Sequence, residues 1–93
     1  METITFDWCD LHNFTKQGIN VASDTTYFYE TGTYTISFTR SLGRGDRIIV
    51  RNRLSKDTAT FETKTIDSIT TKKLFDLCQT VSIKYPFIDE VTV

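Results

Sequence analysis

The sequence predicts an α+β fold: an antiparallel sheet of four to six strands with one long C-terminal helix packed on its apolar face. Two observations support this class. Polar and apolar residues alternate through the middle of the chain, and 17 of its 93 residues are threonine, a β-branched residue that favours strands. After residue 67 the apolar residues recur with the period of a helix. A chain of this length fills one hydrophobic core, so residues 1–93 are predicted to form a single domain.

The N-terminal residues are predicted to form a strand followed by a short helix. Apolar and polar residues alternate over residues 3–8, as in a half-buried strand. The apolar members are Ile4, Phe6 and Trp8. Asp10 is then predicted to cap a short helix over residues 10–18, which Gly18 would end. Residues 18–24 are predicted to form a loop.

Four strands are predicted in the centre of the chain, connected as a meander. They span Thr25–Glu30, Thr33–Arg40, Arg47–Leu54 and Ala59–Ile66. Residues 31–32 are predicted to form a two-residue turn, which would pair Tyr29 with Tyr34. The last turn would place Leu54 opposite Ala59. The fourth strand is the most polar of the set, which is typical of the edge of a sheet.

This pairing predicts which side chains form the core, because directly paired residues share a face. The predicted apolar face consists of Tyr27, Tyr29, Tyr34, Ile36, Phe38, Ile48, Val50, Leu54, Phe61 and Thr63, with Asn52 among them. The outward face is predicted to carry Phe28 beside threonine and serine hydroxyls. A shift of the strand register by one residue would mix the apolar and polar sets on each face, which supports this assignment of side chains to faces.

The C-terminal part is predicted to contain the helix, because five apolar residues lie on one helical face. These residues are Leu74, Leu77, Cys78, Val81 and Tyr85. Either Ser68 or Thr70 is predicted to cap the helix. Pro86 requires the helix to end by Tyr85. Residues 87–93 are predicted to form a terminal strand.

The arginines are concentrated in one segment of the chain. All five lie between residues 40 and 56, a segment of charge +5 that also contains Lys56 and Asp46. The other 76 residues hold five lysines and eleven acids, and carry a charge of −6. The net charge of −1 therefore conceals a strong asymmetry, which is the clearest functional signal in the sequence.

Side chains alternate between the two faces of a strand, and this alternation places much of the segment on or beside the outward face of the sheet. The predicted binding residues are Arg44, Arg47, Arg53, Arg51, Arg40 and Phe28. Arginine favours bidentate pairing with carboxylate or phosphate, and it stacks on planar groups. In the predicted register Arg51 faces Glu62 and forms a cross-strand ion pair. Arg44, Arg47 and Arg53 are then left for a partner.

Residue types that carry catalysis or bind metals are scarce. His12 is the one histidine, and Cys9 and Cys78 are expected to be reduced structural thiols. Structural zinc normally needs four such ligands, so these three candidates predict no metal site. The glycines of residues 43–45 lack the spacing of a phosphate-binding loop, and the Arg-Gly-Asp tripeptide at 44–46 is interpreted as a chance match. No catalytic residue and no cofactor is predicted.

These observations favour a small non-enzymatic protein-binding module that engages an acidic partner surface. Such a module would act as an inhibitor, adaptor or regulator, by analogy with the small stand-alone chains that phages encode. One alternative is a sheet that binds single-stranded nucleic acid by phosphate contacts and base stacking, which the net charge disfavours. A second alternative is a solvated face without a partner. An enzyme is the least favoured class.

The expected compartment is the cytoplasm. The first residues, METITFDW, have neither the basic start nor the apolar core of a signal peptide. No apolar run approaches the roughly 18 residues that a membrane-spanning helix requires. A homodimer is a further alternative, formed through an exposed Ile83 and the predicted terminal strand of residues 87–93.

Overall fold

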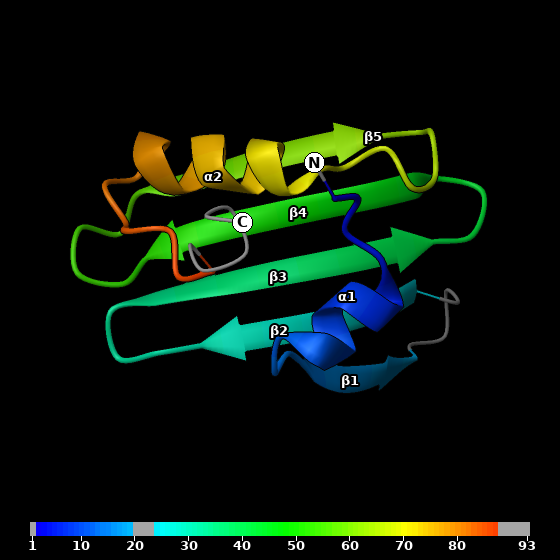
Figure 1. Cartoon of the computed structure of the whole chain (residues 1–93), viewed down its shortest axis with the longest axis horizontal. Coiled ribbons are helices and arrows are strands. Elements are labelled where there is room, and N and C mark those ends of the chain that lie inside the picture. The colour runs from blue at the N-terminus through cyan, green and yellow to red at the C-terminus, as the bar shows by residue number, and fades with distance from the viewer. Residues whose placement is uncertain (1, 20–23, 88–93) are drawn as a thin grey trace.

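The computed structural model describes residues 2–19 and 24–87, and its five strands form one antiparallel sheet (Figure 1). In chain order the elements are α1 (Phe6–Leu11), β1 (Thr15–Ile19), β2 (Asp24–Glu30), β3 (Tyr34–Ser41), β4 (Gly45–Asn52), β5 (Thr58–Thr63) and α2 (Thr71–Thr80). The strand order is β1-β2-β3-β4-β5, so each strand pairs with its neighbour in the sequence. The predicted α+β class, the antiparallel sheet and the C-terminal helix are confirmed.

The predicted N-terminal strand is wrong, because the backbone enters helix α1 at Phe6. Thr5 is the N-cap of this helix, and its hydroxyl accepts a hydrogen bond from the Trp8 amide at 3.1 Å. Before the helix, the Ile4 amide donates to the Ile69 carbonyl at 2.7 Å. Ile4 and Trp8, four residues apart, are both buried. Of the three alternating apolar residues, Ile4 thus lies just before the N-cap and the other two lie in the helix, and all three pack in or against the core without forming a strand.

The short helix predicted over residues 10–18 is also wrong. Helix α1 already ends at Leu11, and Asn13 adopts a left-handed φ of 66°. The Phe14 amide then donates to the Cys9 carbonyl at 3.0 Å, a hydrogen bond that closes many helix C-termini. The chain continues as β1, which takes the place of part of the predicted helix and loop.

The turn between β2 and β3 is longer than predicted. The Thr31 hydroxyl accepts hydrogen bonds from the amides of Thr33 and Tyr34, at 3.2 and 3.1 Å, and these stabilise the wider turn. Tyr29 consequently pairs with Ile36 rather than with Tyr34. Because the register moves by two residues, the side chains of both strands keep their predicted faces.

The pairing of β4 with β5 is displaced by four residues. Val50, rather than Leu54, lies opposite Ala59. Leu54 belongs to the turn and is 75% exposed, so its predicted place in the core is wrong. The displacement is again even, and Ile48 and Phe61 still point towards the core as predicted. β5 lies at the edge of the sheet, as its polar composition predicted.

Helix α2 is shorter than predicted and ends well before Tyr85. Thr70, one of the two predicted caps, is its N-cap, and the Thr70 hydroxyl accepts a hydrogen bond from the Lys73 amide at 3.2 Å. Tyr85 is buried as predicted, but it lies beyond the helix, in the segment that leads to the end of the described chain.

A Schellman motif ends α2. Ser82 adopts a left-handed φ of 60°, and its amide donates to the Gln79 carbonyl at 3.1 Å. The Ile83 amide donates to the Cys78 carbonyl at 2.8 Å. This arrangement turns Ile83 against the core, so its predicted exposure is wrong. The motif usually carries glycine where this chain has serine, which is why the sequence pattern did not indicate it.

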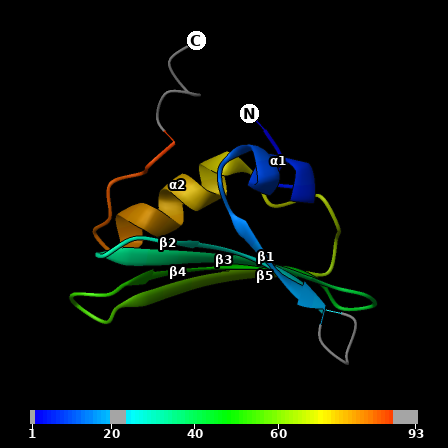
Figure 2. The same cartoon turned by 90° about the horizontal axis from the view of Figure 1, so that it is seen from below.

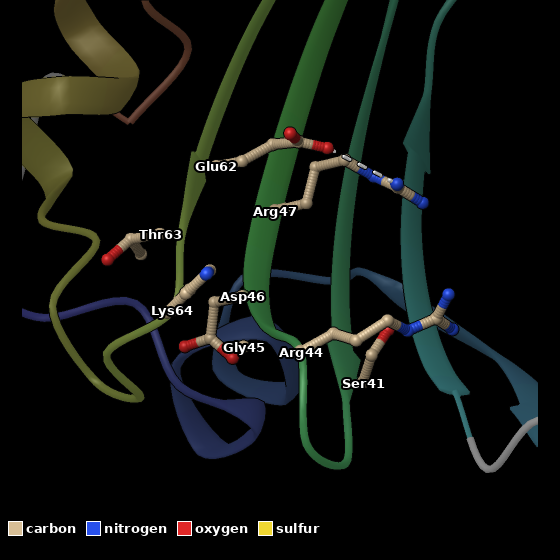
Figure 3. A pocket seen from close by; sticks show the side chains of 8 residues that line it. All are labelled: Ser41, Arg44, Gly45, Asp46, Arg47, Glu62, Thr63 and Lys64. Carbon is tan, nitrogen blue, oxygen red and sulfur yellow. Dashed lines mark hydrogen bonds and ion pairs between the residues drawn. The ribbon is translucent and has the colours of Figure 1, made fainter.

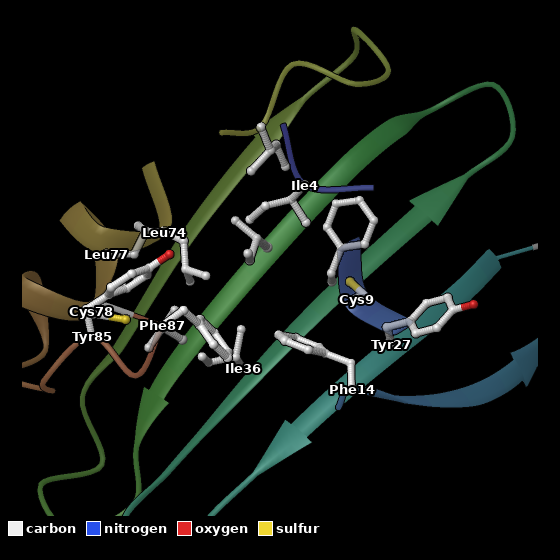
Figure 4. Packing of buried hydrophobic residues seen from close by; sticks show 14 of the residues in the cluster. Ile4, Cys9, Phe14, Tyr27, Ile36, Leu74, Leu77, Cys78, Tyr85 and Phe87 are labelled. Carbon is white, nitrogen blue, oxygen red and sulfur yellow. The ribbon is translucent and has the colours of Figure 1, made fainter. Parts of the chain in front are cut away.

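Both helices lie on the same side of the sheet (Figure 2). Helix α2 packs on β4 and β5, and α1 lies over β2, where the Phe6 ring stacks on Tyr27 with 5.1 Å between centroids. The core fills the space between these layers (Figure 4). Neither described helix combines the length and the apolar character needed to cross a membrane.

The segment after α2 completes the core. The Phe87 ring lies 5.1 Å from that of Trp8 and 5.6 Å from that of Tyr85. Phe87 thereby joins the N-terminal helix to the segment after the C-terminal helix. The rest of the predicted terminal strand, residues 88–93, lies outside the described residues.

Candidate functional site

The side of the sheet opposite the helices, called the open face below, is covered by no described element (Figure 2). Alternate residues of the strands supply its side chains. From β2 to β5 these are Thr26, Phe28 and Glu30; Thr35, Ser37 and Thr39; Arg47, Ile49 and Arg51; and Thr58, Thr60 and Glu62. Hydroxyl groups thus surround the arginines, and two apolar side chains lie among them.

The predicted ion pair between Arg51 and Glu62 is wrong. Arg47 lies opposite Glu62 instead, and a distance of 3.5 Å separates the Arg47 Nη1 and Glu62 Oε1 atoms. The longer β4–β5 turn causes this exchange, because it displaces the register by four residues. Arg51 lies between Thr35 and Thr58, and it forms no ion pair within the described part of the chain.

Arg44 and Arg53, which the sequence left unpaired, each hold a carboxylate of β2. Arg44 Nη2 donates to both carboxylate oxygens of Asp24, at 3.0 and 3.1 Å. Arg53 Nη1 donates to Glu30 Oε2 at 3.1 Å. Surface ion pairs contribute about 0–1 kcal/mol each. The Glu30 side chain is 56% exposed, so the carboxylate or phosphate of a partner can replace it at small cost, whereas the Asp24 side chain is only 13% exposed.

Arg40 lies on the helix-covered side of the sheet and does not contribute to the open face. Its guanidinium donates to the two Asp46 carboxylate oxygens at 2.7 and 2.9 Å, and to Asp67 at 2.6 Å. The same group lies over the Phe6 ring, 5.0 Å from its centroid. The hydrogen bonds to Asp46 raise the pKa of Arg40. Arg40 is thus a structural residue, and its predicted place beside the binding surface is corrected.

A pocket of about 430 Å³ opens where β4 begins (Figure 3). It is lined by Ser41, Arg44, Gly45, Asp46, Arg47, Glu62, Thr63 and Lys64. The two arginines extend to one side of β4 and Asp46 to the other, and both arginines already hold carboxylates. The Asp46 side chain is 0% exposed, so the Arg-Gly-Asp tripeptide cannot present its acid to a receptor.

A second pocket, of about 420 Å³, lies on the open face where the predicted binding residues converge. It is called the Phe28 pocket below, and it is lined by Phe28, Glu30, Thr35, Arg51, Arg53 and Lys56. Among the described residues Arg51 and Lys56 have no ion pair. Three of the predicted residues, Phe28, Arg51 and Arg53, therefore meet in one place with two uncompensated positive charges.

Asn52 organises the turn that brings Lys56 into this pocket. Its side-chain oxygen accepts hydrogen bonds from the amides of Leu54 and Ser55 at 2.9 and 3.1 Å. Its side-chain nitrogen donates to the Val81 carbonyl at 2.8 Å, which ties the turn to the end of α2. The sequence signal for this role was an amide on the predicted apolar face, since a buried polar group needs partners. Lys56 was not among the predicted binding residues, and the structure shows that it also lines this pocket.

Replacing Lys56 with glycine is expected to raise stability slightly while removing the cation. Lys56 has a left-handed φ of 71°, which costs a residue with a side chain about 1–2 kcal/mol. Glycine avoids this strain. It also gives the unfolded chain more conformational freedom, which stabilises the unfolded state and offsets about 0.4–1 kcal/mol of the gain. Urea unfolding should therefore show Lys56→Gly to be about 0.5 kcal/mol more stable than the parent chain. Lys56→Ala keeps the strain and is the control, in which no gain is expected.

The described residues contain no group of three side chains that could hold a metal ion. The His12 ring stacks on Trp8 at 4.1 Å between centroids, and its Nδ1 atom lies 2.6 Å from the Trp8 carbonyl oxygen. Cys9 and Cys78 are free thiols, and both are fully buried in the core. The histidine and the cysteines thus pack within the fold rather than converge on a cleft.

Burial raises the pKa of both Cys9 and Cys78 from 9.0 to about 12. In the unfolded chain the thiols ionise near their ordinary pKa, whereas in the folded protein they stay neutral. Their contribution to stability is therefore complete below pH 9 and is lost as the pH rises towards 12. We expect the urea concentration at the midpoint of unfolding to decrease as the pH is raised from 8.5 to 10.5. In a Cys9→Ala/Cys78→Ala variant this decrease should be smaller, and an equal decrease would contradict the assignment.

Comparison of the chain with protein-family models, with characterised proteins and with solved structures finds no match.

Proposed function

We propose that this chain is a non-enzymatic protein-binding module that engages an acidic surface of its partner with the open face. The observation that carries this proposal is Arg51, a side chain of the open face near the end of β4 that has no ion pair among the described residues. It lies in one pocket with the Phe28 ring, Arg53 and Lys56. Arginine and aromatic side chains are the usual energetic anchors of protein interfaces.

The charge distribution favours an acidic partner. Arg44, Arg47 and Arg53 are each matched by one carboxylate of this chain, so Arg51 and Lys56 are the cations of β4 and its following turn that have no ion pair within the described part of the chain. These two side chains supply the specific attraction, and the carboxylates of the two exposed pairs, Arg47–Glu62 and Arg53–Glu30, can be replaced by those of a partner. A domain that binds in this way acts on its partner as an inhibitor, an adaptor or a regulator.

Single-stranded nucleic acid is the second candidate, and the Phe28 ring favours it. The ring shares a pocket with three cations, and base stacking beside phosphate contacts is the usual way in which sheets bind single strands. One half-buried ring is a small stacking platform, however. The arginines of the open face are also mostly paired with carboxylates, which weakens the attraction for a polyanion.

Affinity capture from the native host tests the proposal. The Arg51→Glu/Arg53→Glu variant is expected to lose a partner that the parent chain retains, with affinity lowered about 100-fold, because charge reversal at two anchors introduces repulsion. The control is Lys72→Glu/Lys84→Glu, which makes the same change of charge at exposed positions on and after α2. Loss of the partner in both variants, or in neither, would reject the open face as the binding surface.

Nuclease treatment of the same samples separates the two candidates. A protein partner should be captured equally with and without nuclease. If nuclease removes the captured material, or if a mixed single-stranded oligonucleotide binds with a steep dependence on salt, nucleic acid becomes the preferred ligand.

A further inference from the structure

We propose that the Phe28 pocket binds a phosphate group carried on an aromatic ring, specifically a phosphotyrosine side chain in an acidic segment of the partner. The inference rests on the proposed function, since it names the group that anchors the partner. It is carried by the juxtaposition of one aromatic side chain, two uncompensated cations and a hydroxyl group in a hollow of about 420 Å³.

The charge of the pocket matches a dianion. Among the described residues that line the pocket Glu30 is the one carboxylate, and it is already paired with Arg53 at 3.1 Å. Arg51 and Lys56 remain without a carboxylate from the described residues, so the pocket has a net charge of +2. A phosphate monoester carries about −1.5 to −2 at pH 7, whereas one aspartate or glutamate supplies only half of the compensating charge.

The donors are arranged for an oxyanion. Thr35 lies directly between Glu30 and Arg51 in the cross-strand register, so its side chain and that of Arg51 are neighbours on the open face and line the same pocket. An arginine fork can donate two parallel hydrogen bonds to phosphate oxygens, and the Thr35 hydroxyl can donate a third. Lys56 adds a point charge from the turn after β4. Glu30 is one strand further from Arg51 than Thr35 is, and its carboxylate accepts a hydrogen bond from Arg53.

The span of the pocket favours an aromatic carrier. Phe28 belongs to β2 and Arg51 to β4, with β3 between them. Neighbouring strands are about 4.8 Å apart, and Arg51 is in register with Glu30, two residues along β2 from Phe28, so the ring and the guanidinium arise from backbone positions roughly 12 Å apart. A ligand that contacts both must carry its charge at the far end of a flat apolar group. Phosphotyrosine has this shape, whereas aspartate, glutamate and phosphoserine are too short to pack on Phe28 while their charge reaches Arg51.

Fluorescence polarisation with labelled pentapeptides tests this inference on the full chain. The central residue of an otherwise identical glutamate-flanked peptide is phosphotyrosine, tyrosine, phosphoserine or aspartate. The phosphotyrosine peptide is expected to bind at least ten-fold more tightly than the other three. Arg51→Gln and Lys56→Gln should each weaken it about ten-fold, and Phe28→Leu should weaken the phosphotyrosine peptide but not the phosphoserine peptide. Lys72→Gln is the control of equal charge change, and thermal unfolding checks that every variant is folded.

The remaining outcomes separate this inference from the proposed function. If all four peptides bind equally and binding still depends on Arg51, the phosphotyrosine assignment is rejected while an acidic protein partner stands. If Arg51→Gln and Lys72→Gln weaken binding to the same extent, the pocket is rejected as the site. If a single-stranded oligonucleotide of equal charge binds more tightly than the phosphotyrosine peptide and loses affinity in Arg51→Gln, both the inference and the proposed function fail.

Discussion

Replacing Asp46 with asparagine should lower the free energy of unfolding by about 3 kcal/mol, the lower end of the cost of removing one partner from a buried ion pair. The Asp46 carboxylate is 0% exposed and accepts two hydrogen bonds from Arg40. It also accepts one from the Asp67 amide at 3.1 Å. Asparagine keeps the shape of the side chain but leaves the Arg40 charge, which is mostly buried, without its principal partner. Urea unfolding followed by circular dichroism measures the change.

The matched control is Asp67→Asn, which removes the second carboxylate that Arg40 contacts. The Asp67 side chain is 55% exposed, so solvent screens the pair, and we expect a loss below about 1 kcal/mol. Asparagine also tolerates the left-handed φ of 63° at this position. Equal losses in the two variants would show that burial of the Asp46–Arg40 pair does not govern its contribution.

Gly45→Ala is the second change with a large expected effect. Gly45 has a φ of 99°, and a Cβ atom at this position would overlap the Thr63 carbonyl oxygen and lie 2.6 Å from the Lys64 Cα atom. Both obstacles are backbone atoms at the end of β5, so the strand itself must move. We expect about 3 kcal/mol of destabilisation, from about 1–2 kcal/mol of left-handed strain and about 1–3 kcal/mol of overpacking.

Gly43→Ala provides the comparison within the same loop. Gly43 has a similar φ of 83°, but a Cβ atom there would meet nothing within 4 Å. Only the backbone strain remains, so the expected loss is about 1–2 kcal/mol. The difference between the two variants measures the close approach of the first residue of β4 to the end of β5. If Gly43→Ala were as destabilising as Gly45→Ala, this packing would not be the cause.

These residues show how one charged segment serves two purposes. Arg40 and Asp46 belong to the strand positions that also carry Ile36 and Ile48, and they form a buried pair beside the core. Arg51, on the opposite parity, remains available for a partner. A charge count over the segment cannot distinguish these roles, but strand parity can. The inward position of Arg40 was therefore within reach of the sequence pattern.

The α+β class and the inward or outward direction of side chains in β2–β5 were determined by the sequence alone. Both follow from hydrophobic periodicity, which is a local property. A period of two survives any even change of register, so turns that were longer than predicted exchanged the pairing partners without exchanging the faces. Asp46 lies two residues before the inward-facing Ile48, and its side chain points to the same face, where it pairs with Arg40.

The tertiary structure decided the features that depend on which residue lies opposite which. Hydrogen bonds within the turns placed Glu62 opposite Arg47 rather than Arg51. They also placed Lys56 in the same pocket as Phe28, which no sequence spacing indicated. The ends of both helices likewise depended on left-handed residues, Asn13 and Ser82, that are not glycine. Such contacts arise from the packing of distant segments, and a pattern read along the chain does not contain them.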